Sequence, residues 1–237
     1  VLRVHPPGLK HLERRRKTLV IDQRLAHILN TTRCIPNGIT RHSAPVVTFL
    51  QGRLVITHEY THILQLDMVH GIPETVQDIL GRIYFPNLFQ PIWLIEGLAV
   101  YEETEQTSGG RNRSPGAEMV LRMAALEGPF PSLAQMSVYP DSWPAGQVPY
   151  LFGGSFTQYI AEKYGRDKLA EISIAYSGRG VPFLVTSTGE RVLYASYDDL
   201  WYEWEEKLKA TYKKQEQEVR ARGLTASSQL TTRGYYN

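Results

Sequence analysis

Apolar residues recur at helical spacing between residues 53 and 69. The apolar positions are Leu54, Val55, Tyr60, Ile63, Leu64 and Leu66. Gly71 and Pro73 follow, and both residue types favour the end of a helix. The pattern predicts a mostly buried helix over this stretch.

Further helices are predicted along the rest of the chain. Pro91 suits the first turn of one of them, and the sequence from Ser196 to Asp199 forms a capping box that opens the last. Residues 129–146 hold four prolines and are expected to be irregular. The predicted helices cover residues 75–83, 91–101, 114–127, 150–164, 167–176 and 196–222.

Two segments predict β-structure. Residues 45–50 are apolar and β-branched and are bounded by Pro45 and Gly52, which indicates a strand directly before the helix. It would lie at a sheet edge, where an extended peptide can pair with it, or inside the sheet. Residues 182–195 predict two strands around Thr188-Gly189, and residues 19–29 are read as a strand running into a short helix. The expected fold class is α+β, mainly helical, with a small β-sheet.

The composition is that of an ordinary globular protein and narrows the function only a little. The chain has 237 residues, enough for one large domain or two small ones, with 42% hydrophobic and 21% charged residues. A net charge of +2 gives no reason to expect nucleic acid or an anionic membrane as a partner. No long apolar run predicts a transmembrane segment. Cys34 stands alone, so an internal disulfide is excluded. Val1 in place of Met suggests a fragment or a processed form.

The candidate chemistry lies in the sequence His58-Glu59-Tyr60-Thr61-His62, an H-E-x-x-H pentad. Residues four apart lie on one face of a helix, so both imidazoles can reach one Zn²⁺ at about 2.0–2.1 Å. Glu59 follows the first histidine, where its carboxylate can accept a proton from a metal-bound water. The pentad therefore predicts one zinc ion per chain and a general base.

A catalytic zinc needs a third protein ligand and one open position. Glu96 is the candidate, because it lies in an apolar helix where an unpaired carboxylate is costly. Gly97 beside it leaves space for close approach of the two helices. The alternative is that Glu96 pairs with an arginine such as Arg82 or Arg122.

The pentad together with residues 93–102 resembles the gluzincins, the zinc peptidases that have a downstream glutamate ligand. The closest pattern is that of the aminopeptidase N-like members, whose ligand helix reads W-L-N-E-G-F-A. This chain has Ile95 where they often have Asn, a longer spacing over residues 63–95, and no G-A-M-E-N motif. The resemblance implies a zincin fold and a zinc peptidase from a related branch, with His58, His62 and Glu96 as metal ligands.

The same family places a tyrosine beside the oxyanion, in a Y-x-x-G sequence at the start of a helix. Residues 150–153 have this form, so the resemblance implies Tyr150 as the oxyanion donor. A place in the core is the alternative for Tyr150, and Tyr139, Tyr159 and His70 are the other candidates.

A longer match over residues 45–235 resembles an uncharacterised bacterial group in which a gluzincin domain precedes a β-propeller. It implies a peptidase domain over residues 1–222 and a linker over residues 223–237 toward a following domain. It also implies a peptide or protein substrate and an extracytoplasmic location. The segments that carry the match are residues 58–62, 81–82, 85–87, 93–103, 143–144 and 150–154.

Two other functions fit the same residues. The first is a zinc-containing but inactive domain that binds peptides or scaffolds a partner. The second is a helical module in which the pentad is coincidental. The metal content and the turnover of a peptide substrate distinguish the three.

Overall fold

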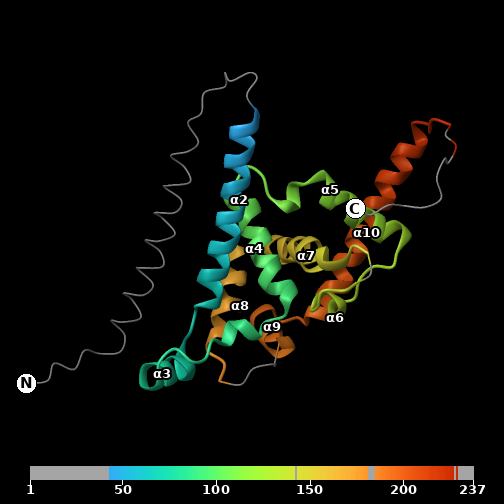
Figure 1. Cartoon of the computed structure of the whole chain (residues 1–237). Helices are drawn as coiled ribbons and strands as arrows, with labels where there is room; N and C mark the ends of the chain where they lie inside the picture. The colour runs from blue at the N-terminus through green and yellow to red at the C-terminus, as the bar shows by residue number, and fades with distance from the viewer. Residues whose placement is uncertain (1–42, 142, 181–184, 227, 229–237) are drawn as a thin grey trace, which may run out of the picture.

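The computed structural model describes residues 43–141, 143–180, 185–226 and 228, and in these residues it contains helices and no strand (Figure 1). Three short 3-10 helices are η1 (Pro86–Phe89), η2 (Arg111–Arg113) and η3 (Ala145–Gln147). The α-helices are α2 (Ser43–Leu66), α3 (Gly71–Leu80), α4 (Ile92–Gln106), α5 (Pro115–Glu127), α6 (Leu133–Met136), α7 (Val148–Tyr164), α8 (Arg166–Ser177), α9 (Val185–Leu193) and α10 (Tyr197–Ala221).

The strands predicted at 45–50 and within 185–193 are wrong, and the expected α+β class is replaced by an all-helical fold in the described part of the chain. Residues 45–50 form the first turns of α2, because a short apolar run has the same pattern in a strand and in a buried helix. Gly189 lies inside α9 rather than in a hairpin turn. The ring of Tyr197 lies 2.6 Å from where a Cβ of Gly189 would be, so this contact needs glycine. The segment 19–29 lies outside the described residues.

The helix predictions for the later part of the chain are confirmed. The Ser114 hydroxyl caps α5 by accepting from the Ala117 amide, and the Ser196 hydroxyl accepts from the Asp199 amide at the start of α10. Gly165, with φ +93°, ends α7. The predicted helix over 75–83 begins earlier than expected, because Gly71 opens α3 instead of only ending α2.

Helix α4 lies between α2 and α7, and α10 closes the far side of the fold against α5 and α7 (Figure 1). The core between α4, α7 and α10 is aromatic. Trp93 and Phe156 have ring centroids 5.1 Å apart, and Trp201 and Trp204 have centroids 4.6 Å apart. Aromatic packing of this kind fixes how α4 and α7 are oriented. Helices α4 and α7 are therefore held in place by their packing against α10.

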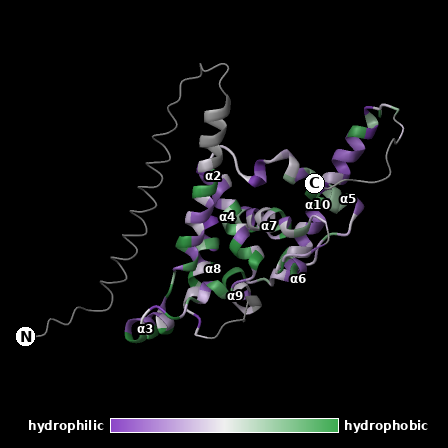
Figure 2. Cartoon of the chain, viewed as in Figure 1, coloured by the Kyte–Doolittle hydropathy of each residue, from purple (hydrophilic) through white to green (hydrophobic). Residues whose placement is uncertain are grey.

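Helix α2 was expected to be mostly buried, and this holds for one side only. Thr57, His58 and Gln65 are buried, whereas Val55, Ile56 and Ile63 are exposed, as are apolar residues of α3. Figure 2 shows hydrophobic positions along both helices. The sequence pattern predicted too much burial, because apolar residues occur on all sides of this helix. Within the described residues, mainly the side that faces α4 is covered. Among these residues, no helix combines the length and apolar character needed to cross a bilayer.

Helices α4 and α7 approach each other closely, with glycines at their contact. A Cβ on Gly97 would lie 2.5 Å from the Gly153 carbonyl oxygen and 2.6 Å from Thr157 Oγ1. A Cβ on Gly153 would lie 2.6 Å from the Trp93 carbonyl oxygen. Gly97 was expected to admit a close approach of the pentad helix; this contact is instead with α7. It places Glu96 and the first turn of α7 side by side.

The variant Gly97→Ala is expected to lower the free energy of unfolding by about 1–3 kcal/mol, because the added methyl group has no space beside α7. Chemical denaturation of the metal-free protein measures this. Gly116→Ala is the matched control, since a Cβ there meets only Ser114 Oγ at 3.6 Å. The control should be neutral or slightly stabilising. A Gly97→Ala protein as stable as the unsubstituted one would contradict the close contact.

Candidate metal centre

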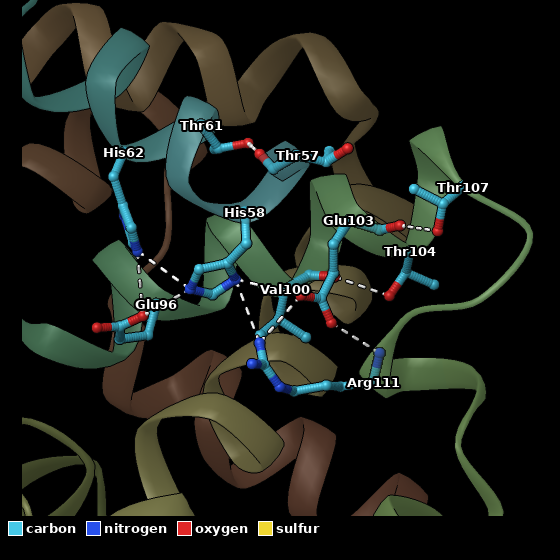
Figure 3. A network of polar contacts seen from close by, with 10 residues as sticks. All are labelled: Thr57, His58, Thr61, His62, Glu96, Val100, Glu103, Thr104, Thr107 and Arg111. Carbon is cyan, nitrogen blue, oxygen red and sulfur yellow. Dashed lines mark hydrogen bonds and ion pairs between the residues drawn. The ribbon is translucent and has the colours of Figure 1, made fainter. Parts of the chain in front are cut away.

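Two histidines of α2 and one glutamate of α4 form a group that could hold a metal ion (Figure 3). His58 Nε2 lies 3.1 Å from His62 Nε2 and 3.2 Å from Glu96 Oε2. His62 Nε2 lies 3.2 Å from the same carboxylate oxygen. The three atoms therefore form a nearly equilateral triangle. His58 is buried and the other two side chains are nearly so.

The dimensions of this triangle fit a small divalent cation. Ligand atoms 3.1–3.2 Å apart, each about 2.0–2.1 Å from one ion, place that ion about 1 Å above their plane. The fourth position of a tetrahedron then stays open. The ring nitrogens of His58 and His62 also face each other, and two lone pairs at this distance repel unless a proton or a cation lies between them. Two imidazoles and one carboxylate suit zinc, and other divalent ions also accept them.

Glu103 supports the first histidine from behind. Its Oε2 atom lies 3.2 Å from His58 Nδ1, and the residue is only 2% exposed. A proton on Nδ1 that is donated to Glu103 turns the lone pair of Nε2 toward the metal position and strengthens it as a ligand. His62 differs, because its Nδ1 is buried and has no hydrogen-bond partner in the described part of the chain.

Glu103 was not among the predicted site residues, although the sequence holds a signal for it. Glu103 follows Glu96 by seven residues, two helical turns, and so lies on the same face of α4. Ala99 and Val100, one turn before it, are apolar, although its direct neighbours Glu102 and Thr104 are polar. A second carboxylate in register with the first is the sequence signal that points to a partner for His58.

Arg111, in η2, completes this side of the site. Its backbone amide donates to Glu103 Oε1 at 2.9 Å, and its Nη1 donates to Glu103 Oε2 at 3.0 Å (Figure 3). Nη1 also lies 3.2 Å from His58 Nδ1. Because Nδ1 cannot accept from Arg111 while it donates to Glu103, we assign the ring proton to the bond with the carboxylate. Arg111 therefore reaches Glu103, the residue behind one of the candidate metal ligands.

Burial and hydrogen bonds set the charge states of His58 and Glu96 when no metal is bound. Burial acts to lower the pKa of His58, but its hydrogen bonds to Glu103 and Glu96 outweigh burial and raise the pKa from 6.5 to about 8. Burial acts to raise the pKa of Glu96, but its hydrogen bonds from His58 and His62 lower it well below its usual range. Without a metal, the cluster therefore holds a protonated His58 against an ionised Glu96 at neutral pH.

Of the tyrosines considered as oxyanion donors, Tyr150 and Tyr139 lie beside the candidate metal ligands, whereas Tyr159 does not. The ring of Tyr150 stacks on that of His58 with a centroid distance of 6.1 Å, and Tyr139 donates to Glu96 Oε1 at 3.3 Å. Burial and the neighbouring Tyr139 raise the pKa of Tyr150 well above 10, so its phenol remains a neutral donor. Tyr159 stacks on Phe156 in the core, and His70 precedes α3.

The remaining predicted residues are placed as follows. Glu59 is exposed on α2, one residue after the metal-facing His58. Arg82 pairs with Asp67, and Arg122 Nη1 lies 3.7 Å from Glu118, so neither arginine compensates Glu96.

The end of α2 that carries His62 is fixed by buried amides that the sequence analysis missed. Gln65 donates to Gln90 Oε1 at 2.6 Å. Asn87 donates to the Gln65 carbonyl at 2.6 Å and to the Ser173 carbonyl at 3.2 Å. These bonds join α2 to η1 and α8, so the second histidine stands on an anchored turn.

The fold and the site together define a helical protein with a His-His-Glu group suited to a metal ion. No family model matches the chain, and no solved structure matches it. A protein of Treponema pallidum (strain Nichols) described as "Uncharacterized protein" is 29% identical over 118 residues. The match covers half of this chain and a tenth of that relative, which is a distant similarity to a much longer protein.

Zinc affinity is expected to depend on pH through His58. Zinc must displace the proton that His58 holds below pH about 8, so the apparent affinity should fall about tenfold per pH unit below that value and level off above it. Because the pKa of His58 is higher in the folded chain, protonation of His58 adds to the free energy of unfolding of the metal-free protein. This contribution is fully present below pH 6.5 and is lost as the pH rises through about 8. Competition with a chromophoric chelator across this range measures the affinity.

The variant Glu103→Gln is the control for this pH dependence. It removes the carboxylate that raises the pKa of His58, so the affinity should level off at a lower pH. A zinc affinity independent of pH between about 6 and 9 would contradict the assignment of His58 as a ligand.

Proposed function

We propose that this chain is a zinc-dependent peptidase that hydrolyses peptide bonds with a metal-activated water. The observation that carries the proposal is the triangle of His58, His62 and Glu96 ligand atoms, 3.1–3.2 Å apart, with Glu59 next in sequence to the first ligand. That combination supplies the three protein ligands, the open position and the carboxylate base that metal-assisted hydrolysis requires.

Each residue has a defined role in this proposal. The bound ion would supply Lewis acidity and lower the pKa of its water toward 7. Glu59 accepts the proton of the attacking water and later donates it to the leaving amine. Its exposed position on α2 leaves it open to both water and a substrate. Glu103 keeps the His58 ring in the tautomer whose Nε2 can ligate.

Tyr150 is proposed as the donor to the oxyanion, and its surroundings support this. Its ring stacks against His58, and its phenol stays protonated because burial raises its pKa. Tyr139 already donates to Glu96 Oε1, the oxygen outside the ligand triangle. We therefore assign Tyr139 to orienting the ligand carboxylate and Tyr150 to the substrate.

The domain division belongs to the same proposal. We place the peptidase domain over residues 1–222 and a linker over 223–237. The end of α10 at Ala221 and the positive φ of Gly223, +88°, support a boundary there.

Glu59→Gln is expected to keep zinc and to lower peptide turnover by at least about 100-fold, because the amide cannot accept the proton of the water. Hydrolysis of a quenched-fluorophore peptide library, with zinc content measured on the same samples, tests this. Glu127→Gln at the end of α5 is the matched control and should leave turnover unchanged. Full turnover in Glu59→Gln would exclude Glu59 as the base. Zinc binding with no turnover in the unsubstituted chain would instead favour the inactive peptide-binding domain.

Tyr150→Phe is expected to lower kcat by about 100-fold or more with little change in KM, because a transition-state donor acts on kcat. Tyr139→Phe is the comparison. It removes the hydrogen bond to Glu96 and should reduce zinc affinity more than the kcat of the zinc-saturated enzyme. Steady-state kinetics at saturating zinc separate the two. If Tyr139→Phe lost more kcat than Tyr150→Phe, Tyr139 and not Tyr150 would be the oxyanion donor.

A further inference from the structure

The loop after α4 returns to the metal centre, and one of its side chains contacts the support of a metal ligand (Figure 3). We propose that Arg111 is a positioning residue that holds Glu103, and through Glu103 the His58 ring, in the orientation that binds metal. The inference rests on the metal site of the proposed function but not on its peptidase activity.

Glu103 is a buried carboxylate, and its position depends on the hydrogen bonds that it accepts. Glu103 is 2% exposed and receives three donors: His58 Nδ1 at 3.2 Å, the Arg111 amide at 2.9 Å and Arg111 Nη1 at 3.0 Å. A buried carboxylate that loses donors is costly, and it either moves or takes up a proton. Two of the three donors belong to Arg111, one from its backbone and one from its side chain, so the loop and the guanidinium together position this carboxylate.

The loop is built to hold Arg111 in place. Gly110 has φ +101°, and a Cβ on it would lie 2.4 Å from Thr104 Cα, so only glycine allows the chain to turn back here. Arg113 Nη1 donates to the carbonyls of Thr104, Thr107 and Gly109 in and just after the last turn of α4. The loop is therefore tied to the helix that carries both glutamates.

A second anchor ties the loop to α7. Asn112 donates to the Gly154 carbonyl at 3.0 Å. A Cβ on Gly154 would lie 2.8 Å from Asn112 Oδ1 and 2.4 Å from Val100 Cγ1, so this approach also requires glycine. The position of Arg111 is thus fixed from both helices and not by Glu103 alone.

Arg111 also contacts Tyr150, the proposed oxyanion donor. Its guanidinium carbon lies 5.2 Å from the centre of the Tyr150 ring, which itself stacks on His58. This is cation–π geometry. The same side chain therefore holds the carboxylate behind His58 and the aromatic ring beside it.

Two effects of Arg111 on zinc have opposite signs, which makes the proposal testable. Its positive charge, 3.2 Å from His58 Nδ1, repels a divalent cation, so removing the charge alone would tighten zinc binding. The hydrogen bond from its side chain to Glu103 aligns His58, so removing that bond would weaken zinc binding. A positioning role requires that the second effect is the larger.

The experiment measures the Kd of the chain for zinc by competition with a chromophoric chelator. Arg111→Met keeps the aliphatic stem and removes the side-chain donors, and should raise the Kd about tenfold or more. Arg111→Lys restores a donor and should recover part of the loss. Arg166→Ala is the matched control, because Arg166 binds the neighbouring Glu102 of α4 at 2.7 Å, and its Kd should be unchanged. If Arg111→Met does not fold, Arg111→Ala takes its place.

The double variant with Glu103→Gln shows whether Arg111 acts through Glu103. In that background Arg111→Met should cause no further loss of zinc affinity. The visible absorption spectrum of the Co²⁺-loaded chain, which reports ligand geometry, should change in Arg111→Met and not in Arg166→Ala.

Several outcomes overturn the proposal. A zinc Kd that is unchanged or lower in Arg111→Met does so, as does no recovery in Arg111→Lys. An equal loss in both backgrounds also does so, because Arg111 would then act independently of Glu103. These results leave the peptidase proposal standing. Tight zinc binding without peptide hydrolysis would remove the peptidase proposal and leave the role of Arg111 intact.

Discussion

The burial of two carboxylates on one face of α4 is the constraint on which this structure depends. Glu96 and Glu103 lie two turns apart on a helix covered by α2 on one side and α7 on the other. Each must be compensated, since an isolated buried charge is too costly to keep. Glu96 faces the His58 and His62 nitrogens, and Glu103 faces the back of His58. One histidine therefore links both carboxylates.

The packing behind α4 makes this arrangement rigid. The glycine contact between α4 and α7 brings the two backbones together, and the aromatic core holds them from the far side. Since Glu96 adjoins Gly97, and Tyr150 lies one turn before Gly153, the same contact sets the distance between a ligand and the proposed oxyanion donor. The geometry of the proposed site and the packing of the core therefore depend on the same interface.

The residues of the candidate metal site could be predicted from the sequence. The pentad spacing and the isolated acid in an apolar helix were enough to choose the residues that the structure brings together. The cap predicted at Ser196 was reliable because it is a local signal that acts within one turn. The strands at 45–50 and around Thr188-Gly189 failed, because short apolar runs and single glycines have the same pattern in either structure.

The rest depended on contacts between residues far apart in the chain. That Gly97 faces α7 and that Arg111 returns to Glu103 follow from how the helices pack, and no local pattern encodes either contact. The exposed side of α2 has the same origin, because only packing decides which apolar residues are covered. Glu103 is the exception, since its register with Glu96 could have been read from the sequence.

The most direct test of the central claim is the metal content of the purified chain, measured with anomalous scattering at the zinc edge from its crystals. The account predicts one zinc ion per chain, within about 2.0–2.2 Å of His58 Nε2, His62 Nε2 and a Glu96 oxygen, and its loss in Glu96→Ala. A chain that takes up no divalent ion, or that binds zinc equally well without the Glu96 carboxylate, would contradict it.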